Sequence, residues 1–305
     1  MTVDNKDLRT LLCDFLPGLC IESVASPSGQ RVVYYAKFIA PATPSQIGWG
    51  EIVVKIADQL NAHQIAYLQK EILILNSLHS PYYPRLHYNN LISYRPETED
   101  PLPSKIFISI EERAAAVPLT SCNELFSTEQ KISKLLLDLI DGLNLLWSRP
   151  EKIVHRDLKP ANLLIRHDES IVIIDLGIVR EEGKPGITYD DSPWGPCTPL
   201  YASPEQANND KRNISFKSDF FALGTIAYEL RTGSNPYGKS SDDARTIFSK
   251  VREYKPATLF SLGLASEGFS KIIEVLMKKE PFERYRTIPL FKQALLDFRK
   301  AAYGI

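Results

Sequence analysis

The sequence I-V-H-R-D-L-K-P-A-N-L-L, residues 153–164, carries the side chains on which the prediction of fold and function depends. Asp157 and Asn162 stand in a stretch whose composition predicts a loop rather than a helix. Asp175 follows a short β-branched run that predicts a buried strand. Such a set suits phosphoryl transfer, because Asp157 can accept a hydroxyl proton and orient a nucleophile. Asn162 and Asp175 offer the hard oxygen ligands that Mg²⁺ prefers beside nucleotide phosphates.

Two motifs give this region a family resemblance. The stretch from His155 to Asn162 fits H-R-D-x-x-x-x-N, and Asp175-Leu176-Gly177 stands where the matching D-F-G occurs, with Leu in place of Phe. The sequence therefore resembles a eukaryotic-type serine/threonine protein kinase catalytic domain over about residues 19–298. The resemblance implies an α+β, two-lobed protein-kinase-like fold, with a small, mainly β N-lobe and a larger, mainly α C-lobe.

Length and composition agree with this organisation. A chain of 305 residues can bury a large core and hold two lobes. We expect an N-terminal extension (1–18), an N-lobe (19–112) and a C-lobe (113–305). A net charge of −1 favours neither nucleic acid nor anionic membranes as partners. No apolar run reaches the ~20 residues of a membrane span, and the first residues lack the pattern of a secretory signal. The four cysteines are scattered along the chain, which predicts free thiols in the cytoplasm.

The N-lobe residues expected at the site begin with Lys55. It ends I-V-V-K, which is similar to the family's V-A-I-K, so the resemblance implies contact with the α- and β-phosphates of ATP. The predicted helix of about residues 61–78 places Glu71 off its apolar stripe, and Glu71 is the expected ion partner of Lys55. A surface lysine and a solvated glutamate are the alternatives. A short amphipathic helix or a turn, residues 7–16, is expected before the fold proper.

Further N-lobe residues are expected around the nucleotide. Strands are predicted at 19–24, 31–38 and 51–57, and a fourth at 106–110 follows a polar loop, residues 95–104. Ser26, Ser28 and Arg31 occupy the family's three glycine positions, so the phosphate-covering turn departs from the pattern. Backbone groups at 111–113 are expected to bind the adenine edge, with Ile110 behind it. The nucleotide-binding residues implied by the resemblance are Lys55, Val33, Val53, Glu111, Arg113, Leu164 and Asp175.

The C-lobe supplies the rest of the expected catalytic set. A helix over residues 127–147, capped by Ser127, leads to the catalytic loop. Lys159 is placed to neutralise the phosphate in transfer, and Thr198 is expected to hydrogen-bond near Asp157 and Lys159. Cys197 stands where the family has Gly.

Three further expectations concern support of the loops. Asp219 opens a helix, residues 218–232, that is apolar nearly all round. It should be buried and hydrogen-bonded to the catalytic-loop backbone. Arg284 is expected to pair with Glu205 of A-S-P-E. Phosphate on a hydroxyl of the intervening segment could pair with Arg156; the candidates are Thr188, Tyr189 and Ser192, with Asp190 and Asp191 as unmodified substitutes.

The resemblance implies a serine/threonine protein kinase that uses ATP and Mg²⁺ to phosphorylate protein substrates. Self-association for trans-autophosphorylation is a further expectation, while nucleic-acid binding and membrane insertion are not expected. The departure at the glycine positions keeps open a pseudokinase scaffold that binds a partner protein with weak or no catalysis. A kinase-like enzyme acting on a small molecule is the third alternative.

Overall fold

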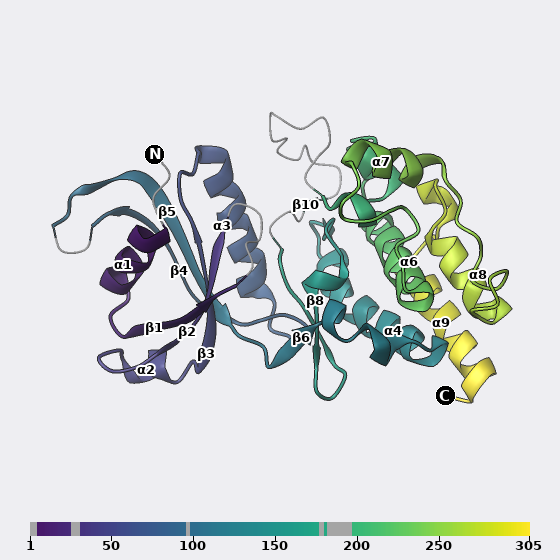
Figure 1. Ribbon diagram of the computed structural model, residues 1–305, viewed down its shortest axis with the longest axis horizontal. Coiled ribbons are helices and arrows are strands. Elements are labelled where there is room, and N and C mark those ends of the chain that lie inside the picture. The colour runs from purple at the N-terminus through teal and green to yellow at the C-terminus, as the bar shows by residue number, and fades with distance from the viewer. Residues whose placement is uncertain (1–4, 26–30, 96–97, 177–179, 182–196) are drawn as a thin grey trace. The chain divides into compact units, whose positions relative to one another are not determined.

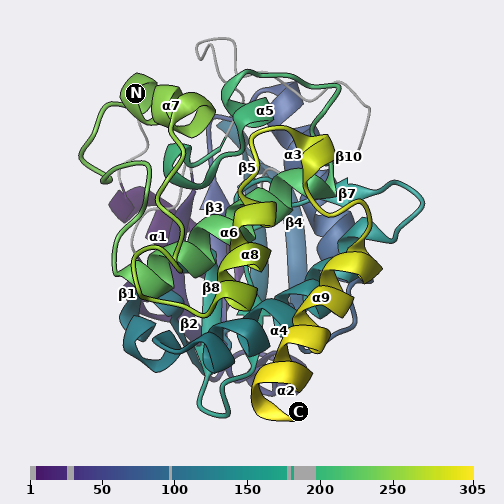
Figure 2. The same cartoon turned by 90° about the vertical axis from the view of Figure 1, so that its right-hand side faces the viewer.

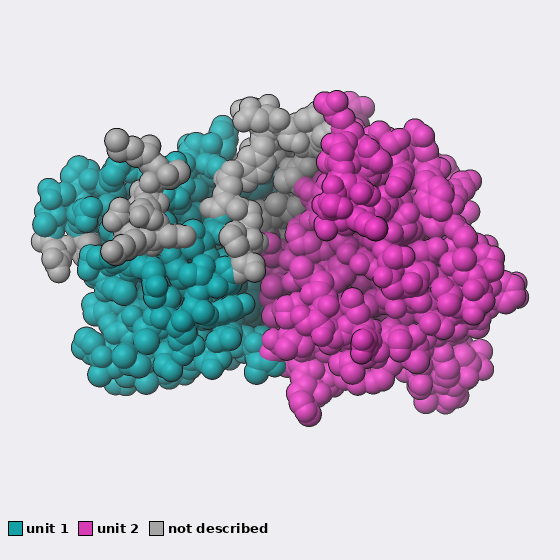
Figure 3. All heavy atoms as spheres, viewed as in Figure 1, with its two compact units in different colours: residues 1–115 teal, residues 116–305 magenta. Residues whose placement is uncertain are grey.

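The computed structural model describes residues 5–25, 31–95, 98–176, 180–181 and 197–305. The chain divides into two compact units, residues 1–115 and residues 116–305 (Figure 3). The predicted turn over residues 26–30 lies outside the described residues, as do Gly177 and the expected phosphorylation candidates Thr188, Tyr189 and Ser192.

The first unit is built on an antiparallel sheet of five strands in the order β1-β2-β3-β5-β4 (Figure 1). Its elements are α1 (Asn5–Phe15), β1 (Leu19–Val24), β2 (Val32–Phe38), α2 (Pro44–Ile47), β3 (Glu51–Ala57), α3 (Ala62–Ser77), β4 (Leu86–Tyr94) and β5 (Pro101–Glu112). This is the small, mainly β unit that the sequence predicts.

Helices α1 and α3 cover opposite faces of this sheet. Leu8 and Leu12 of α1 belong to one buried cluster with Tyr34, Val54 and Ile110 of the strands. On the other face, α3 packs Leu68 and Ile72 against Ala57 and Phe107. The expected helix at the N-terminus is therefore present, and its leucines contribute to the core of the sheet.

The expected strands and helices of this unit are present, with differences in β4, β5 and the start of α3. The sequence analysis missed β4, and β5 begins at Pro101, inside the expected polar loop. Asn61 caps α3 by accepting a hydrogen bond from the Gln64 amide at 2.9 Å, which places the helix start one residue beyond the prediction.

The second unit is mainly helical (Figures 1 and 2). Its α-helices are α4 (Glu129–Trp147), α5 (Pro204–Ala207), α6 (Phe216–Thr232), α7 (Ala244–Glu253), α8 (Glu267–Leu276) and α9 (Ile288–Tyr303). Its short strands are β6 (Ala116–Pro118), β7 (Ile153–Val154), β8 (Leu163–Arg166), β9 (Ile171–Ile173) and β10 (Arg180–Glu181). Single 3₁₀ turns are η1 (Leu119–Ser121), η2 (Asn123–Phe126), η3 (Pro160–Asn162), η4 (Pro199–Tyr201) and η5 (Pro281–Glu283).

Helix α6 lies at the centre of this unit, as its nearly all-round apolar sequence predicts. Phe220 is fully buried, and its ring meets Trp147 of α4 and Phe291 of α9 edge-on, with centroids 5.4 and 4.9 Å away. Gly233 ends α6 with φ = 76°, a left-handed conformation that favours glycine. Thr128, rather than the expected Ser127, caps α4. In the described part of the chain, no helix is both long and apolar enough to cross a bilayer.

Candidate active site

The β8–β9 hairpin brings the two expected metal ligands together. Leu163 pairs with Ile173 across the hairpin, and the Ile174 amide donates to the Asn162 carbonyl at 3.0 Å. Asp175 follows directly and has φ = 67°, a left-handed conformation uncommon for a residue with a β-carbon. Such strain is found mainly where function requires it, so the hairpin and the strained residue together hold the Asp175 backbone beside Asn162.

Asp157 is the centre of a network that joins two separate loops. Its Oδ1 accepts hydrogen bonds from the Thr198 hydroxyl at 2.6 Å and the Thr198 amide at 2.9 Å. Lys159 Nζ lies 2.8 Å from Asp157 Oδ2 and also donates to Thr198 Oγ1 at 2.9 Å. Asp157, Lys159 and Thr198 therefore form the cluster that the sequence analysis expects, with the carboxylate and the ammonium in contact.

Asn162 is fixed by the same aspartate. Its Nδ2 donates to the Asp157 carbonyl at 2.9 Å and lies 3.4 Å from Asp157 Oδ2. An amide has one donor end and one acceptor end. Because the Asn162 Nδ2 donates to Asp157, its Oδ1 is the end that can bind a cation.

The donor set fits magnesium. In the described part of the chain, no group of three or more His, Cys, Asp or Glu side chains gathers as a metal site. Mg²⁺ is usually held by one or two protein oxygen ligands together with substrate phosphates and water. Asn162 and Asp175 supply hard oxygens of that kind, whereas they would be poor ligands for a soft metal.

Asp219 is hydrogen-bonded to the backbone of the catalytic loop, as predicted. It is 1% exposed at the start of α6. It accepts hydrogen bonds from the amides of His155 and Arg156 at 2.9 Å each and from Trp147 Nε1 at 2.8 Å. Burial raises the pKa of the Asp219 carboxyl, and the adjacent His155 and these donors oppose that rise. Arg156 has φ = 73°, so Asp219 holds a strained loop in place.

Residues 197–201 form the expected platform beside Asp157. Burial, followed by the nearby Asp157 carboxylate, raises the pKa of the Cys197 thiol to about 12. Cys197 therefore behaves as a small neutral side chain in the place of glycine. Tyr201 donates to Glu229 at 2.8 Å, and Asn235 Nδ2 reaches both Glu229 and the Leu200 carbonyl, at 3.1 and 3.3 Å. These contacts hold the platform against α6.

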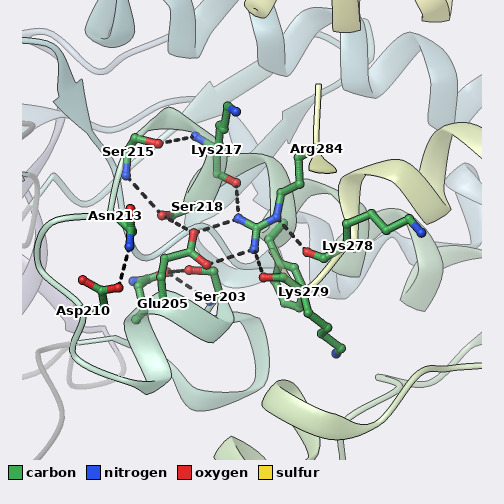
Figure 4. A network of polar contacts seen from close by, with 12 residues as sticks. Ser203, Glu205, Asp210, Asn213, Ser215, Lys217, Ser218, Lys278, Lys279 and Arg284 are labelled. Atoms are coloured by element: carbon green, nitrogen blue, oxygen red, sulfur yellow. Dashed lines mark hydrogen bonds and ion pairs between the residues drawn. The ribbon is translucent and has the colours of Figure 1, made fainter. Parts of the chain in front are cut away.

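The expected Arg284–Glu205 ion pair is present and completely buried (Figure 4). Arg284 NH1 and NH2 meet the two carboxylate oxygens at 2.7 and 2.9 Å, and the side chains are 0% and 3% exposed. The remaining donors of the guanidinium reach the carbonyls of Lys217, Lys278 and Lys279. Ser218 Oγ donates to Glu205 Oε1 at 2.6 Å, so the pair ties α5 to the start of α6.

In the first unit, the ion pairs differ from the expected one. Lys55 Nζ lies 2.8 Å from Glu111 Oε1. Arg31 NH1 lies 3.0 and 2.9 Å from the two oxygens of Glu71. The predicted Lys55–Glu71 pair is therefore wrong, because α3 presents Glu71 to Arg31 while Glu111 lies beside Lys55 on the sheet. Sequence reasoning missed Arg31 as an ion partner. The only sequence signal was a positive charge directly before β2.

Four of the expected nucleotide-binding residues share one face of the sheet. Val33 lies opposite Lys55 between β2 and β3, and Val53 lies opposite Glu111 between β3 and β5. Side chains two residues apart on a strand point to the same face, so the register brings these four together. Ile110 points the other way, into the α1 cluster, and the expectation that it borders the nucleotide is wrong.

Two amides of the expected adenine-binding backbone at 111–113 are hydrogen-bonded within the first unit. The Glu112 amide donates to the Arg85 carbonyl at 2.8 Å, and the Arg113 amide donates to the Glu51 carbonyl at 3.1 Å. The Arg113 guanidinium lies over the Tyr35 ring, 4.2 Å from its centroid. Neither of these two amides is therefore available to a base. Leu164, in the second unit, lies half-buried on β8 opposite Val172.

Comparison with known proteins places this geometry in a family. Residues 50–296 match the family model described as a protein kinase domain. The serine/threonine-protein kinase PknB of Mycobacterium tuberculosis is 30% identical over 161 residues, which are 52% of this chain and 25% of that protein. The probable serine/threonine-protein kinase nek2 of Dictyostelium discoideum is 25% identical over 221 residues, 70% of this chain and 50% of the relative.

A third relative, ribosomal protein S6 kinase 2 alpha of Xenopus laevis, is 25% identical over 255 residues, which are 83% of this chain and 31% of the relative. The chain thus spans between a quarter and half of the length of these three relatives. The family match itself covers most of the chain, including the catalytic loop, the β8–β9 hairpin and the Arg284–Glu205 pair. This chain belongs to the protein kinase family.

Proposed function

We propose that this chain is a serine/threonine protein kinase that transfers the γ-phosphate of ATP to Ser or Thr hydroxyls of protein substrates. The observation that carries the proposal is the contact between Asp157, Lys159 and Thr198. A carboxylate that can receive a hydroxyl proton lies 2.8 Å from an ammonium that can offset phosphate charge. The names of two relatives, PknB and nek2, support Ser and Thr as the acceptor residues.

Each residue has a role that follows from its position. Asp157 orients the acceptor hydroxyl and takes its proton, and the Thr198 hydroxyl 2.6 Å away holds the carboxylate in place. Lys159 offsets the charge on the phosphoryl group in transfer. Asn162 and Asp175 hold Mg²⁺, which when bound neutralises phosphate charge. Lys55 binds the α- and β-phosphates of ATP, and Val33, Val53 and Leu164 contact the base.

The proposal extends to the setting in which the chain acts. All four cysteines are free thiols, which supports a reducing compartment, and we place the protein in the cytoplasm. Its partners are protein substrates and a second copy of the chain for trans-autophosphorylation. The division into an extension of residues 1–18, an N-lobe of residues 19–112 and a C-lobe of residues 113–305 remains part of the proposal.

The test replaces the proposed base without changing its size. The variant Asp157→Asn keeps the shape of the side chain but cannot take a proton. With Mg²⁺, labelled ATP and a mixture of Ser-, Thr- and Tyr-containing peptides, we expect its turnover to fall by about 10²–10⁴-fold. Asp168→Asn, an exposed aspartate at the end of the same hairpin, is the matched control and should retain wild-type turnover.

Two results would contradict the proposal. One is a wild-type protein that binds ATP and transfers no phosphate, which is the behaviour of a pseudokinase scaffold. The other is an Asp157→Asn variant as active as the Asp168→Asn control. Mass spectrometry of the products decides the acceptor, since phosphate on Tyr alone would exclude the Ser/Thr assignment.

A further inference from the structure

Two largely buried ion pairs lie in the first unit. Lys55 pairs with Glu111 and Arg31 with Glu71, whereas the sequence predicted a Lys55–Glu71 pair. Lys55 and Glu111 have side chains 14% and 4% exposed, and Arg31 and Glu71 have side chains 17% and 5% exposed. Lys55 and Glu111 stand on neighbouring strands of one sheet, β3 and β5. Lys55 faces Ser109, and Glu111 faces Val53 two residues away, so Lys55 and Glu111 are diagonal neighbours on one face.

Glu111 depends on Lys55. Its Oε1 is buried, and among the described residues the Lys55 ammonium, 2.8 Å from this oxygen, offsets its charge. A buried carboxylate without a counter-charge is costly. Any arrangement that drew Lys55 away to another carboxylate would leave Glu111 in that state.

Glu71 is already neutralised. Arg31 NH1 contacts both of its oxygens, at 3.0 and 2.9 Å, and a charge-assisted contact to a guanidinium is among the stronger polar interactions in proteins. Lys55 could reach Glu71 only in competition with Arg31.

We propose that Glu111 is the residue that positions Lys55 for the phosphates of ATP, and that Arg31 holds Glu71 apart from this task. The inference rests on the proposed function, since it concerns the phosphate-binding lysine of the same site. An ammonium has three donors, so the contact with Glu111 is compatible with a second contact to phosphate. Glu111 acts through Lys55 and is a positioning residue.

The arrangement has a consequence for control of the site. Glu111 and Lys55 are both fixed by the ladder of hydrogen bonds between β3 and β5, whereas Glu71 belongs to helix α3. A lysine positioned from within the sheet keeps its place wherever α3 stands. Nucleotide affinity should therefore be insensitive to changes that affect α3 alone.

The experiment compares Glu111→Gln with Glu71→Gln. Both carboxylates are buried to a similar degree, and each has one basic partner among the described residues, so the structural cost of the two substitutions is matched. The probe is Mg–ATP, with affinity measured by calorimetry and KM and kcat from the peptide assay. Glu112→Gln, the next residue on β5, is the control for the strand, and thermal unfolding checks that each variant is folded.

We expect Glu111→Gln to raise the Kd and KM for Mg–ATP by about 10- to 100-fold, the value of one charge-assisted contact. Its kcat should change by less than about threefold, because the substitution leaves Asp157 and Lys159 untouched. Glu71→Gln and Glu112→Gln should leave affinity within about threefold of wild type. Glu111→Asp, which keeps the charge on a shorter side chain, should recover part of the lost affinity.

Loss of affinity in Glu71→Gln equal to or greater than that in Glu111→Gln would overturn the proposal, and so would unchanged affinity in Glu111→Gln. If Glu111→Gln does not fold, Glu111→Asp decides: a KM equal to that of wild type overturns the proposal, and an increased KM supports it. If the wild type binds Mg–ATP but transfers no phosphate, the proposed function fails while the affinities still decide the role of Glu111. A wild type that binds no Mg–ATP would overturn both.

Discussion

The buried pair of Arg284 and Glu205 predicts a large loss of stability when one partner is removed. The side chains are 0% and 3% exposed, and the guanidinium also reaches three carbonyls of the chain. Arg284→Met keeps the aliphatic part of the side chain but leaves the Glu205 carboxylate buried without its counter-charge. Breaking a buried pair in this way costs about 3–5 kcal/mol. For a unit of this size, that corresponds to a decrease in Tm of roughly 10 °C.

The measurement is urea denaturation followed by far-UV circular dichroism, which reports mainly on the helices of the second unit. Lys134→Met is the matched control, because Lys134 forms an ion pair with Asp138 on the surface of α4, where the side chains are 50% and 24% exposed. An exposed pair at this helical spacing contributes about 0.3–0.5 kcal/mol. The two substitutions remove the same kind of charge in different surroundings.

A double variant separates the charge from the packing. Glu205→Leu combined with Arg284→Met removes both charges and should be more stable than Arg284→Met alone by at least about 1 kcal/mol. The reasoning fails if Arg284→Met costs less than about 1 kcal/mol, no more than the Lys134 control. It also fails if the double variant is less stable than Arg284→Met by the full cost of Glu205→Leu alone. The loss in Arg284→Met would then not come from a buried Glu205 carboxylate without a counter-charge.

Three other perturbations have defined outcomes. Thr198→Val removes a hydroxyl bonded to both Asp157 and Lys159, so steady-state assays should show kcat reduced about 10- to 100-fold, with recovery in Thr198→Ser. Asp219→Asn turns an amide group toward three donors; denaturation should show a loss of about 1–3 kcal/mol, and wild-type stability would contradict the network. Burial lowers the pKa of Lys279 to about 8, from 10.5. Between pH 8 and pH 10.5, about the two pKa values, the unfolded chain binds more protons than the folded one. The free energy of unfolding should therefore rise with pH through this window. The rise should be absent in Lys279→Met, and equal pH profiles would refute it.

The catalytic loop was predictable from sequence because its chemistry is encoded locally. Asp157, Lys159 and Asn162 lie within six positions of one another, and the short strand before Asp175 is visible as a β-branched run. The long-range contact of Thr198 was expected only through the family resemblance, and that of Asp219 from the cost of burying an unpaired carboxylate at the start of an apolar helix. The structure places both side chains against the catalytic loop, although nothing in their local sequence indicates which loop they meet.

Two features of the first unit were not predictable from local pattern. Strand β4 contains His87, Asn89 and Asn90 among its apolar residues, so its alternation is too weak to read, and its position is set by pairing with β5. The faces of β5 were also ambiguous. A strand buried on both sides has no polar alternation, and Ser109, Ile110 and Glu111 could each have faced the nucleotide side until the register with β3 was known.

The exchange of ion partners has the same origin at a higher level. Two acidic and two basic side chains can form ion pairs in two ways. The charges alone do not favour either arrangement, because each contains two pairs of opposite charge. What separates them is which groups the backbone places within about 3 Å in a setting of low dielectric, where an unpaired charge is expensive. That placement comes from the β3–β5 register and from the face that α3 presents, neither of which is written in the residues around Lys55. Motifs therefore identify the reactive groups, while the partner that positions each group follows from the packing of the whole unit.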